Sequence, residues 1–169
     1  MAKKTQRIRS NTVQKARPKP GARVKGKGKI QAKPKEVDGI KFKSMLEVFC
    51  YRKLKELGVA FTYEEHSYQL TEAFYYPCPI FETKATTKEF ADKSKDKIRG
   101  ISYTPDFVSH DADGKLLWVI ECKGFANDRF PNTWKNFKKH LMDNDSVCPL
   151  FLPKDQKQIL QVIQLISEL

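Results

Sequence analysis

Residues 101–124 have the sequence ISYTPDFVSHDADGKLLWVIECKG, and most of the architecture predicted for the chain follows from this segment. Two runs rich in apolar and β-branched residues flank its central Asp-Ala-Asp-Gly turn. They predict one strand over residues 101–109 and a second over residues 115–123. We therefore expect the two strands to lie side by side.

Three ionisable side chains are expected to meet at one end of this strand pair. Successive side chains of a strand point to opposite faces, so Glu121 and Lys123 share one face while Ile120 and Cys122 share the other. Asp106 lies on the neighbouring strand directly after a proline, where the two strands can splay. The pattern predicts that two carboxylates and one ammonium group converge.

Two interpretations of this convergence are open. Carboxylates with room for bound water are the ligands that Mg²⁺ prefers. A lysine beside such an ion can orient or deprotonate a water, or balance negative charge that develops at phosphorus. The alternative is an ordinary hairpin with solvated charges on its outer face. That alternative suffices for Asp106 alone or for Lys123 alone, whereas the whole constellation favours the metal site.

A helix is predicted from Met45 to Leu57, ended by Gly58. Its expected apolar stripe consists of Leu46, Phe49, Cys50, Leu54 and Leu57. Glu47 borders this stripe in the first turn and, with Ser44, fits a capping box, which explains a glutamate here without any further role. The other interpretation aims the Glu47 carboxylate at the metal centre, and the sequence leaves both open.

The positive charge of the chain is concentrated at one end. The formal net charge is +12, and residues 1–35 contain 13 of the 32 Lys and Arg residues but no acidic residue. The remaining residues, 36–169, carry 19 basic and 20 acidic side chains and are expected to form one folded domain. Residues 1–35 have few large apolar side chains, so we expect a disordered arm that contacts DNA phosphates. The alternative is a solubilising or targeting tail. The arm cations assigned to DNA are Arg7, Arg9, Arg17, Arg23, Lys25, Lys27 and Lys29.

Further strands and helices are predicted on both sides of the central segment. We expect a short strand or turn over residues 37–42, strands over residues 59–65 and 67–74, and a strand over residues 147–152. An amphipathic helix is expected over residues 154–169. Its inward-facing residues are Ile159, Val162, Ile163 and Ile166.

Another helix, predicted over residues 132–143, carries three lysines on one side. Its buried stripe is expected to contain Trp134, Phe137 and Leu141. The lysines on another side are Lys135, Lys138 and Lys139. They are candidates to hold the phosphates of the scissile strand, and a solvated helix face is an equally good explanation.

Residues 75–100 are predicted to be an insertion or a long loop, with a short helix within residues 83–99. Tyr75, Tyr76 and Phe81 are suited to stacking on nucleic-acid bases. Packing against the domain is the alternative that we favour for these three side chains.

Cysteine and hydropathy patterns address the compartment. The four cysteines include no Cys-x-x-Cys pair, so we expect reduced thiols and no zinc site. No apolar run approaches membrane-spanning length, and the N-terminus lacks the apolar segment of a secretory signal. We therefore expect a protein of the cytoplasm or nucleoid, in the host cytoplasm if it is phage-encoded, without a membrane partner.

Three blocks of sequence resemble the PD-(D/E)xK nuclease superfamily: Ser44-Met-Leu-Glu47, Tyr103-Thr-Pro-Asp106 and Glu121-Cys-Lys-Gly124. Within it, the spacing and the last two blocks are similar to the phage endonuclease I family of Holliday junction resolvases. Residues 36–42 also resemble an uncharacterised phage branch. The likeness covers residues 36–152 and implies an α/β (mixed α+β) fold with a restriction-endonuclease-like core, in which helices flank a central mixed sheet. The segment 75–100 and the basic arm depart from the endonuclease I pattern.

The resemblance also implies roles for individual residues. Asp106 and Glu121 would ligate Mg²⁺, for which Mn²⁺ can substitute, with the backbone carbonyl of Cys122 as a third ligand. Lys123 would act on the attacking water, and Glu47 would join through a water or a second metal ion. The catalytic set is thus Glu47, Asp106, Glu121 and Lys123, and the implied products have 5′-phosphate and 3′-hydroxyl ends.

These observations together predict a Mg²⁺-dependent endodeoxyribonuclease that acts on branched phage-type DNA as a Holliday junction resolvase. We expect a homodimer, because symmetrical cleavage of two strands calls for two sites. One alternative is a restriction- or repair-like nuclease on duplex DNA. Another is a non-catalytic DNA-binding protein on a nuclease fold, against which the intact Glu, Asp, Glu and Lys set argues.

Overall fold

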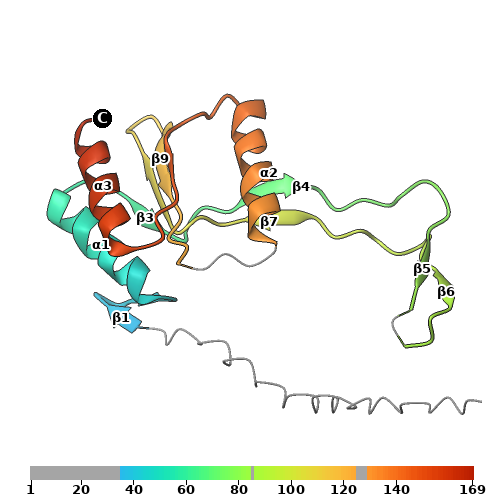
Figure 1. Cartoon of the computed structure of the whole chain (residues 1–169). Helices are drawn as coiled ribbons and strands as arrows, with labels where there is room; N and C mark the ends of the chain where they lie inside the picture. Colours follow the sequence, from blue (N-terminus) through green and yellow to red (C-terminus); the bar gives the residue numbers. More distant parts are fainter. Residues whose placement is uncertain (1–34, 85, 125–128) are drawn as a thin grey trace, which may run out of the picture. The chain divides into compact units, whose positions relative to one another are not determined.

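The structure is a computed structural model that describes residues 35–84, 86–124 and 129–169 (Figure 1). Within these residues the chain forms three helices and ten short strands, which confirms the expected mixed α/β class. The predicted disordered arm lies outside the described residues except for Lys35, the first residue of strand β1 (Lys35–Val37). No helix in the described ranges is long and apolar enough to cross a membrane.

A four-stranded mixed sheet with the strand order β10-β9-β8-β3 carries the core. Its strands are β3 (Thr62–Tyr63), β8 (Phe107–His110), β9 (Leu116–Ile120) and β10 (Leu150–Phe151). Strand β8 pairs antiparallel with both β9 and β3, whereas β10 pairs parallel with β9. The predicted strands over residues 59–65 and 147–152 are therefore present but shorter than expected.

The predicted strand over residues 101–109 is wrong at its centre. Strand β7 (Ile101–Tyr103) pairs antiparallel with β4 (Tyr68–Thr71) in a separate two-stranded sheet, and β8 begins only at Phe107. Pro105 has no amide hydrogen for a ladder and restricts the residue before it, so regular pairing ends there. The chain thus passes from one sheet to the other directly before β8.

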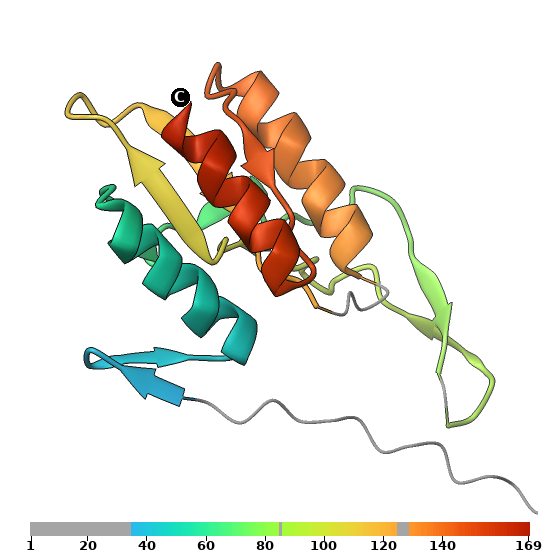
Figure 2. The same ribbon diagram turned by 60° about the vertical axis from the view of Figure 1, so that its left-hand side comes forward.

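Helices cover both faces of the mixed sheet (Figures 1 and 2). Helices α1 (Met45–Leu57) and α3 (Gln156–Ser167) pack with Phe107, Trp118 and Ile120. Helix α2 (Phe130–Asp143) packs with Val108 and Val119 on the other face. Because side chains alternate along β8 and β9, each strand contributes to both cores.

Helix α1 has the predicted bounds, but its buried face differs from the predicted stripe. Cys50 and Leu54 are buried as expected, while Val48 and Tyr51 are buried as well. The predicted members Leu46, Phe49 and Leu57 are only partly buried. A hairpin of β1 and β2 (Ile40–Phe42) causes the difference, because it covers a second side of the helix.

This hairpin is anchored to α1 by its turn. Asp38 and Gly39 have φ angles of 53° and 77°, the conformation of a two-residue type I′ turn. The Asp38 carboxylate accepts hydrogen bonds from the Tyr51 hydroxyl at 2.9 Å and from the Lys55 ammonium at 2.8 Å. The turn therefore fixes the segment that leads into the first turn of α1.

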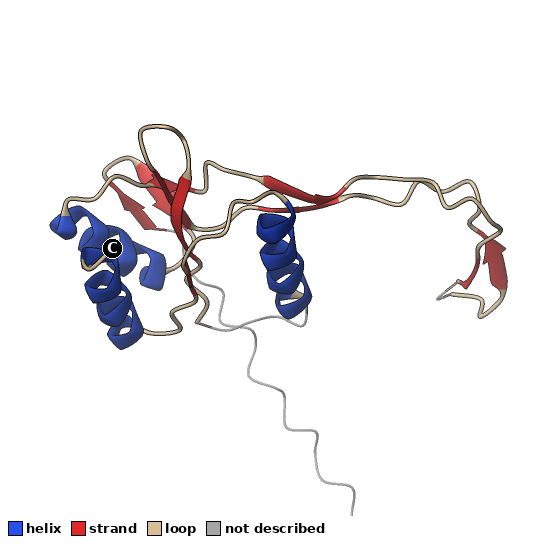
Figure 3. Cartoon of the chain, turned by 90° about the horizontal axis from the view of Figure 1, so that it is seen from above, coloured by secondary structure: helices blue, strands red, loops and turns tan. Residues whose placement is uncertain are grey.

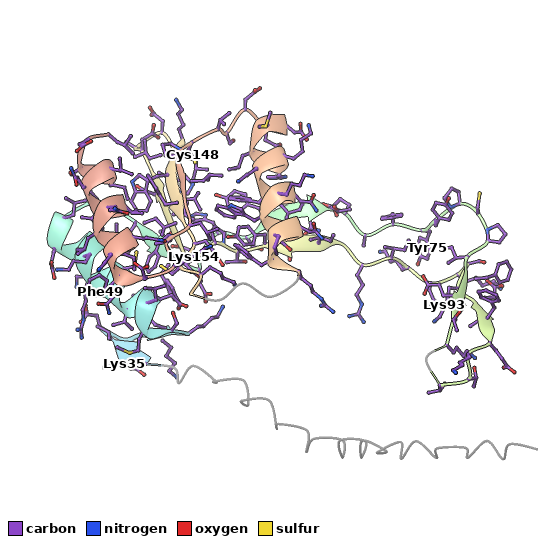
Figure 4. All side chains as sticks on the ribbon, in the orientation of Figure 1. Lys35, Phe49, Tyr75, Lys93, Cys148 and Lys154 are labelled. Carbon is purple, nitrogen blue, oxygen red and sulfur yellow. The ribbon has the colours of Figure 1, made fainter. Side chains whose placement is uncertain are left out.

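The segment 75–100 forms a hairpin instead of the expected short helix. Strands β5 (Phe81–Thr83) and β6 (Phe90–Asp92) pair antiparallel (Figure 3). Tyr75, Tyr76 and Phe81 are 63%, 49% and 60% exposed, so packing against the domain, the use that we favoured for these three side chains, is wrong. The side chains of this segment, including the labelled Tyr75 and Lys93, are drawn in Figure 4.

The remaining helices and the cysteines agree with the sequence analysis. Helix α2 buries Trp134, Phe137 and Leu141, and adds Phe130. Helix α3 buries Ile159, Val162 and Ile166, with Ile163 partly buried. The four cysteines are all free.

Candidate active site

All four side chains of the predicted catalytic set line one open cavity of about 390 Å³. Glu47 comes from the first turn of α1, Asp106 directly precedes β8, and Glu121 and Lys123 directly follow β9. Because Phe107 is the register partner of Ile120, the ends of β8 and β9 place Asp106 and Glu121 next to each other. The structure therefore brings together in one cavity four residues that are separated along the sequence.

Asp106 is a buried carboxyl group of the cavity whose pKa is raised. Its side chain accepts a hydrogen bond through Oδ2 from the Cys122 amide at 2.7 Å, and Oδ1 accepts none from a described residue. Only 7% of Asp106 is exposed. Burial, followed by the charges of Glu121 and Glu47, raises the pKa of Asp106 to about 8. A cation in this cavity would relieve that repulsion.

Glu121 is buried and held by two donors. The Tyr103 hydroxyl donates to Oε2 at 2.7 Å, and the Lys123 ammonium donates to Oε1 at 3.3 Å. Burial and the nearby Glu121 charge raise the pKa of Tyr103, which keeps its hydroxyl protonated as a donor. The segment after β9 stays in register because the amides of Glu121 and Lys123 donate to the carbonyls of Phe151 and Pro153 at 2.9 and 3.0 Å.

Glu47 both caps α1 and lines the cavity. Its amide donates to Ser44 Oγ at 3.2 Å, and the Ser44 hydroxyl donates to Oε1 at 2.7 Å. Oε2 accepts from the Lys43 amide at 2.8 Å and from the Tyr63 hydroxyl at 2.7 Å. The reciprocal bonds resemble a capping box, with the Lys43 amide in place of the N-cap amide. Capping therefore does not exclude a role of Glu47 in the cavity.

Lys123 has its charge at the edge of the cavity. Its Nζ atom lies 3.3 Å from Glu121 Oε1 and 4.6 Å from the centre of the Phe130 ring. A cation over an aromatic face is attracted by the ring quadrupole. The ammonium group is thus held next to the carboxylates while more than a quarter of its side chain stays exposed.

Several residues that sequence analysis did not assign to the site also line the cavity. Lys43, Glu64, Tyr103 and Arg129 are among them. The Lys43 ammonium donates to the Glu64 carboxylate, and this bond is the largest cause of the raised pKa of Lys43. Tyr103 stands in the Tyr-Thr-Pro-Asp block and could have been suspected. Arg129 has no local pattern that marks it.

The predicted DNA-binding lysines are exposed but do not line the cavity. Lys139 pairs with Asp143, and Lys138 Nζ lies 5.7 Å from the centre of the Trp134 ring. Lys135 is exposed on the same side of α2. Their contact with DNA stays a prediction, and the seven predicted cations of the arm lie outside the described residues.

The donor set is compatible with a hard divalent cation. In the side-chain positions of the described residues, no group of three or more His, Cys, Asp and Glu residues is arranged to hold a metal ion. Mg²⁺, however, is usually bound by one or two carboxylates and retains several waters. Asp106 and Glu121 supply such a pair, Asp106 Oδ1 has no other partner among the described residues, and the cavity is open.

Comparison with known proteins gives one match. A family model described as "Protein of unknown function (DUF1064)" matches residues 27–149, which include Glu47, Asp106, Glu121 and Lys123. No curated protein and no solved structure matches the chain.

Proposed function

The chain belongs to the DUF1064 family of proteins of unknown function, and from its acidic cavity we propose that it is a divalent-metal-dependent endodeoxyribonuclease. The observation that carries the proposal is the convergence of Glu47, Asp106, Glu121 and Lys123 on one cavity, with all three carboxylates buried. Buried carboxylates that repel one another cost stability, and such clusters are concentrated at functional sites.

The carboxylates of Asp106 and Glu121 would hold a Mg²⁺ ion, which Mn²⁺ can replace. Glu47 would contribute through a water, and the backbone carbonyl of Cys122 would be a further ligand. When bound, the ion would neutralise charge that develops at phosphorus and lower the pKa of a water. The hydrogen bond from the Cys122 amide to Asp106 Oδ2 fixes the orientation of that carboxylate, so Oδ1 has a defined position.

Lys123 has the role of orienting the attacking water and the phosphate. Its ammonium group has three donors, of which Glu121 occupies one in this structure. The remaining donors can bind a water and a phosphate oxygen at the same time. In the reaction, water adds to phosphorus, the bond from phosphorus to O3′ breaks, and O3′ takes up a proton. The products are a 5′-phosphate and a 3′-hydroxyl.

The resemblance to the PD-(D/E)xK superfamily supports this assignment, because its three blocks contribute Glu47, Asp106, Glu121 and Lys123 to the same cavity. The same resemblance suggests branched DNA as the substrate and a Holliday junction resolvase as the activity. Two symmetrical cuts in one junction require two sites, so the proposal includes a homodimer and places the protein in the cytoplasm with its DNA.

Cleavage assays with matched variants test the proposal. Purified protein is incubated with a four-way junction and with a linear duplex of matched sequence, in Mg²⁺, Mn²⁺ or EDTA. We expect cleavage in Mg²⁺ or Mn²⁺ but not in EDTA, and more cleavage of the four-way junction than of the linear duplex. Glu121→Gln keeps the shape of the side chain but removes a hard anionic ligand, so cleavage should fall by at least about 100-fold. Glu72→Gln is the control, because Glu72 is exposed and outside the cavity.

A melting experiment separates loss of the metal from loss of chemistry. Mg²⁺ should raise the melting temperature of the wild type and not that of Glu121→Gln, because a ligand of the native state stabilises it by mass action. Lys123→Met should keep this Mg²⁺ effect while losing cleavage. Wild-type protein that binds junctions and duplexes but cuts neither in either metal would refute the nuclease proposal.

A further inference from the structure

A second cavity, of about 550 Å³, adjoins the acidic cavity. One wall is formed by Gly100 and the start of β7, including Ile101 and Ser102. The other wall is formed by Arg129 and residues of the first half of α2. Arg129 and Thr133 line both cavities, so the two hollows meet at these two side chains. Whatever occupies the acidic cavity can therefore extend into the second one.

The helical wall is a row of polar side chains. Arg129, Asn132, Thr133 and Asn136 are related by spacings of three residues (129 to 132 and 133 to 136) and of four residues (129 to 133 and 132 to 136), so they lie on one side of the helix. The row covers about 10 Å along the helix axis at the helical rise of about 1.5 Å per residue. This length corresponds to about three nucleotides at the rise of about 3.4 Å per nucleotide in a DNA strand.

The two cavities differ in their charged side chains. Among the described residues, no acidic side chain lines the second cavity. The first is lined by Glu47, Glu64, Asp106 and Glu121 together with Lys43, Lys123 and Arg129. Arg129 is exposed and forms no ion pair with a described residue. A DNA backbone is therefore attracted to the boundary where Arg129 lies, and it meets no described carboxylate in the second cavity.

We propose that the second cavity binds the DNA strand on one side of the scissile phosphate. Arg129 contacts a phosphate at the boundary between the cavities, since its guanidinium matches phosphate oxygens as a fork of donors. Asn132 and Asn136 donate hydrogen bonds to the nucleotides that follow, and Ile101, which is 42% exposed, contacts a sugar or base face. The position of the scissile phosphate rests on the proposed nuclease function, but the binding of DNA in this cavity does not require cleavage.

Equilibrium binding in EDTA tests the proposal without relying on cleavage. The full chain is titrated with a fluorescent duplex and a fluorescent four-way junction over a series of salt concentrations. Arg129→Ala should weaken binding and reduce the slope of log affinity against log salt by about 0.9, the loss of one phosphate contact. Asn132→Ala combined with Asn136→Ala should weaken binding by several-fold and leave the slope unchanged, because amides release no counterions.

Lys157→Ala is the control, since Lys157 is exposed on α3 and lines neither cavity. It should change neither affinity nor slope. Wild-type affinity and slope in Arg129→Ala, or wild-type affinity in the double asparagine variant, would overturn the proposal. If Arg129→Ala reduces the salt slope as predicted while the wild-type protein never cleaves DNA, the proposed nuclease function is refuted. The proposal that the second cavity binds DNA is then still supported.

Discussion

Replacing Asp106 by Asn should stabilise the protein at neutral and mildly alkaline pH. Burial and the charges of Glu121 and Glu47 raise the pKa of Asp106 to about 8, from 3.8 for an unperturbed aspartate. Asn has the same shape, carries no charge, and offers an amide oxygen to the Cys122 amide, which lies 2.7 Å from Asp106 Oδ2. The variant therefore keeps the hydrogen bond and removes the electrostatic cost.

The sign and the size of the effect follow from proton linkage. Between about pH 4 and pH 8 the native state retains a proton on Asp106 that the unfolded state releases. Each pH unit in this window then lowers the free energy of unfolding of the wild type by up to about 1.4 kcal/mol relative to the variant. Side chains around the Asp106 carboxylate can turn toward solvent, which reduces the electrostatic cost. We therefore expect the free energy of unfolding of Asp106→Asn to exceed that of the wild type by about 2 kcal/mol at pH 8.

Urea denaturation in EDTA at a series of pH values between about 5 and 8 measures this difference. The difference between Asp106→Asn and wild type should be smallest at the acidic end and grow with pH. Asp113→Asn is the matched control, because Asp113 is exposed in the turn between β8 and β9. A variant that is less stable than wild type at pH 8, or a difference that does not depend on pH, would show that Asp106 is not under electrostatic strain.

Two further predictions concern Glu47 and the basic arm. Glu47→Gln should change the free energy of unfolding by less than about 0.5 kcal/mol, since Gln can accept a hydrogen bond from the Lys43 amide. The rate of cleavage should fall by about 10- to 100-fold. Full activity would show that Glu47 only caps the helix. Deletion of residues 1–35 should flatten a salt slope of about −5 to −6, which corresponds to phosphate contacts by about half of the 13 cations. Cleavage by the truncated protein at saturating concentration and low salt should persist, and an unchanged slope would show that the arm does not bind DNA.

The helices are the part of the fold that the sequence predicts best, because side chains mark their ends. Ser44 caps α1, and Gly58 ends it with a φ angle of 76°, in the left-handed region that glycine adopts easily. Helix α2 begins two residues earlier than expected because Pro131 occupies its first turn, where a proline costs no hydrogen bond. Local chemistry is sufficient at each of these positions.

The strands are predicted less well because pairing partners are distant in the sequence. The apolar pattern from Ile101 to Ser109 is continuous, yet β7 and β8 belong to different sheets. The segment 75–100 has no clear apolar periodicity, so its hairpin could not be distinguished from a loop with a short helix. A rule that places aromatic residues in cores also does not predict that the aromatic side chains of this segment are exposed.

The sequence predicts the charged residues at the centre of the candidate site, but not the residues that surround them. Motif spacing identifies Asp106, Glu121 and Lys123, since their positions follow from strand alternation and one proline. Tyr63 donates to a carboxylate sixteen residues away, and Arg129 reaches the cavity only because α2 packs across the sheet. Such contacts depend on tertiary packing, which no local pattern specifies.

The double role of Glu47 changes what its presence in another family member would mean. A glutamate that caps α1 contributes to folding, so selection for stability alone would keep it in a protein that has lost any activity. Asp106 is the opposite case, because the structure predicts that its charge lowers stability, and drift would replace it once the cavity had no use. In sequences of this family, an aspartate at the position of Asp106 is therefore the better indicator of a working site than a glutamate at the position of Glu47.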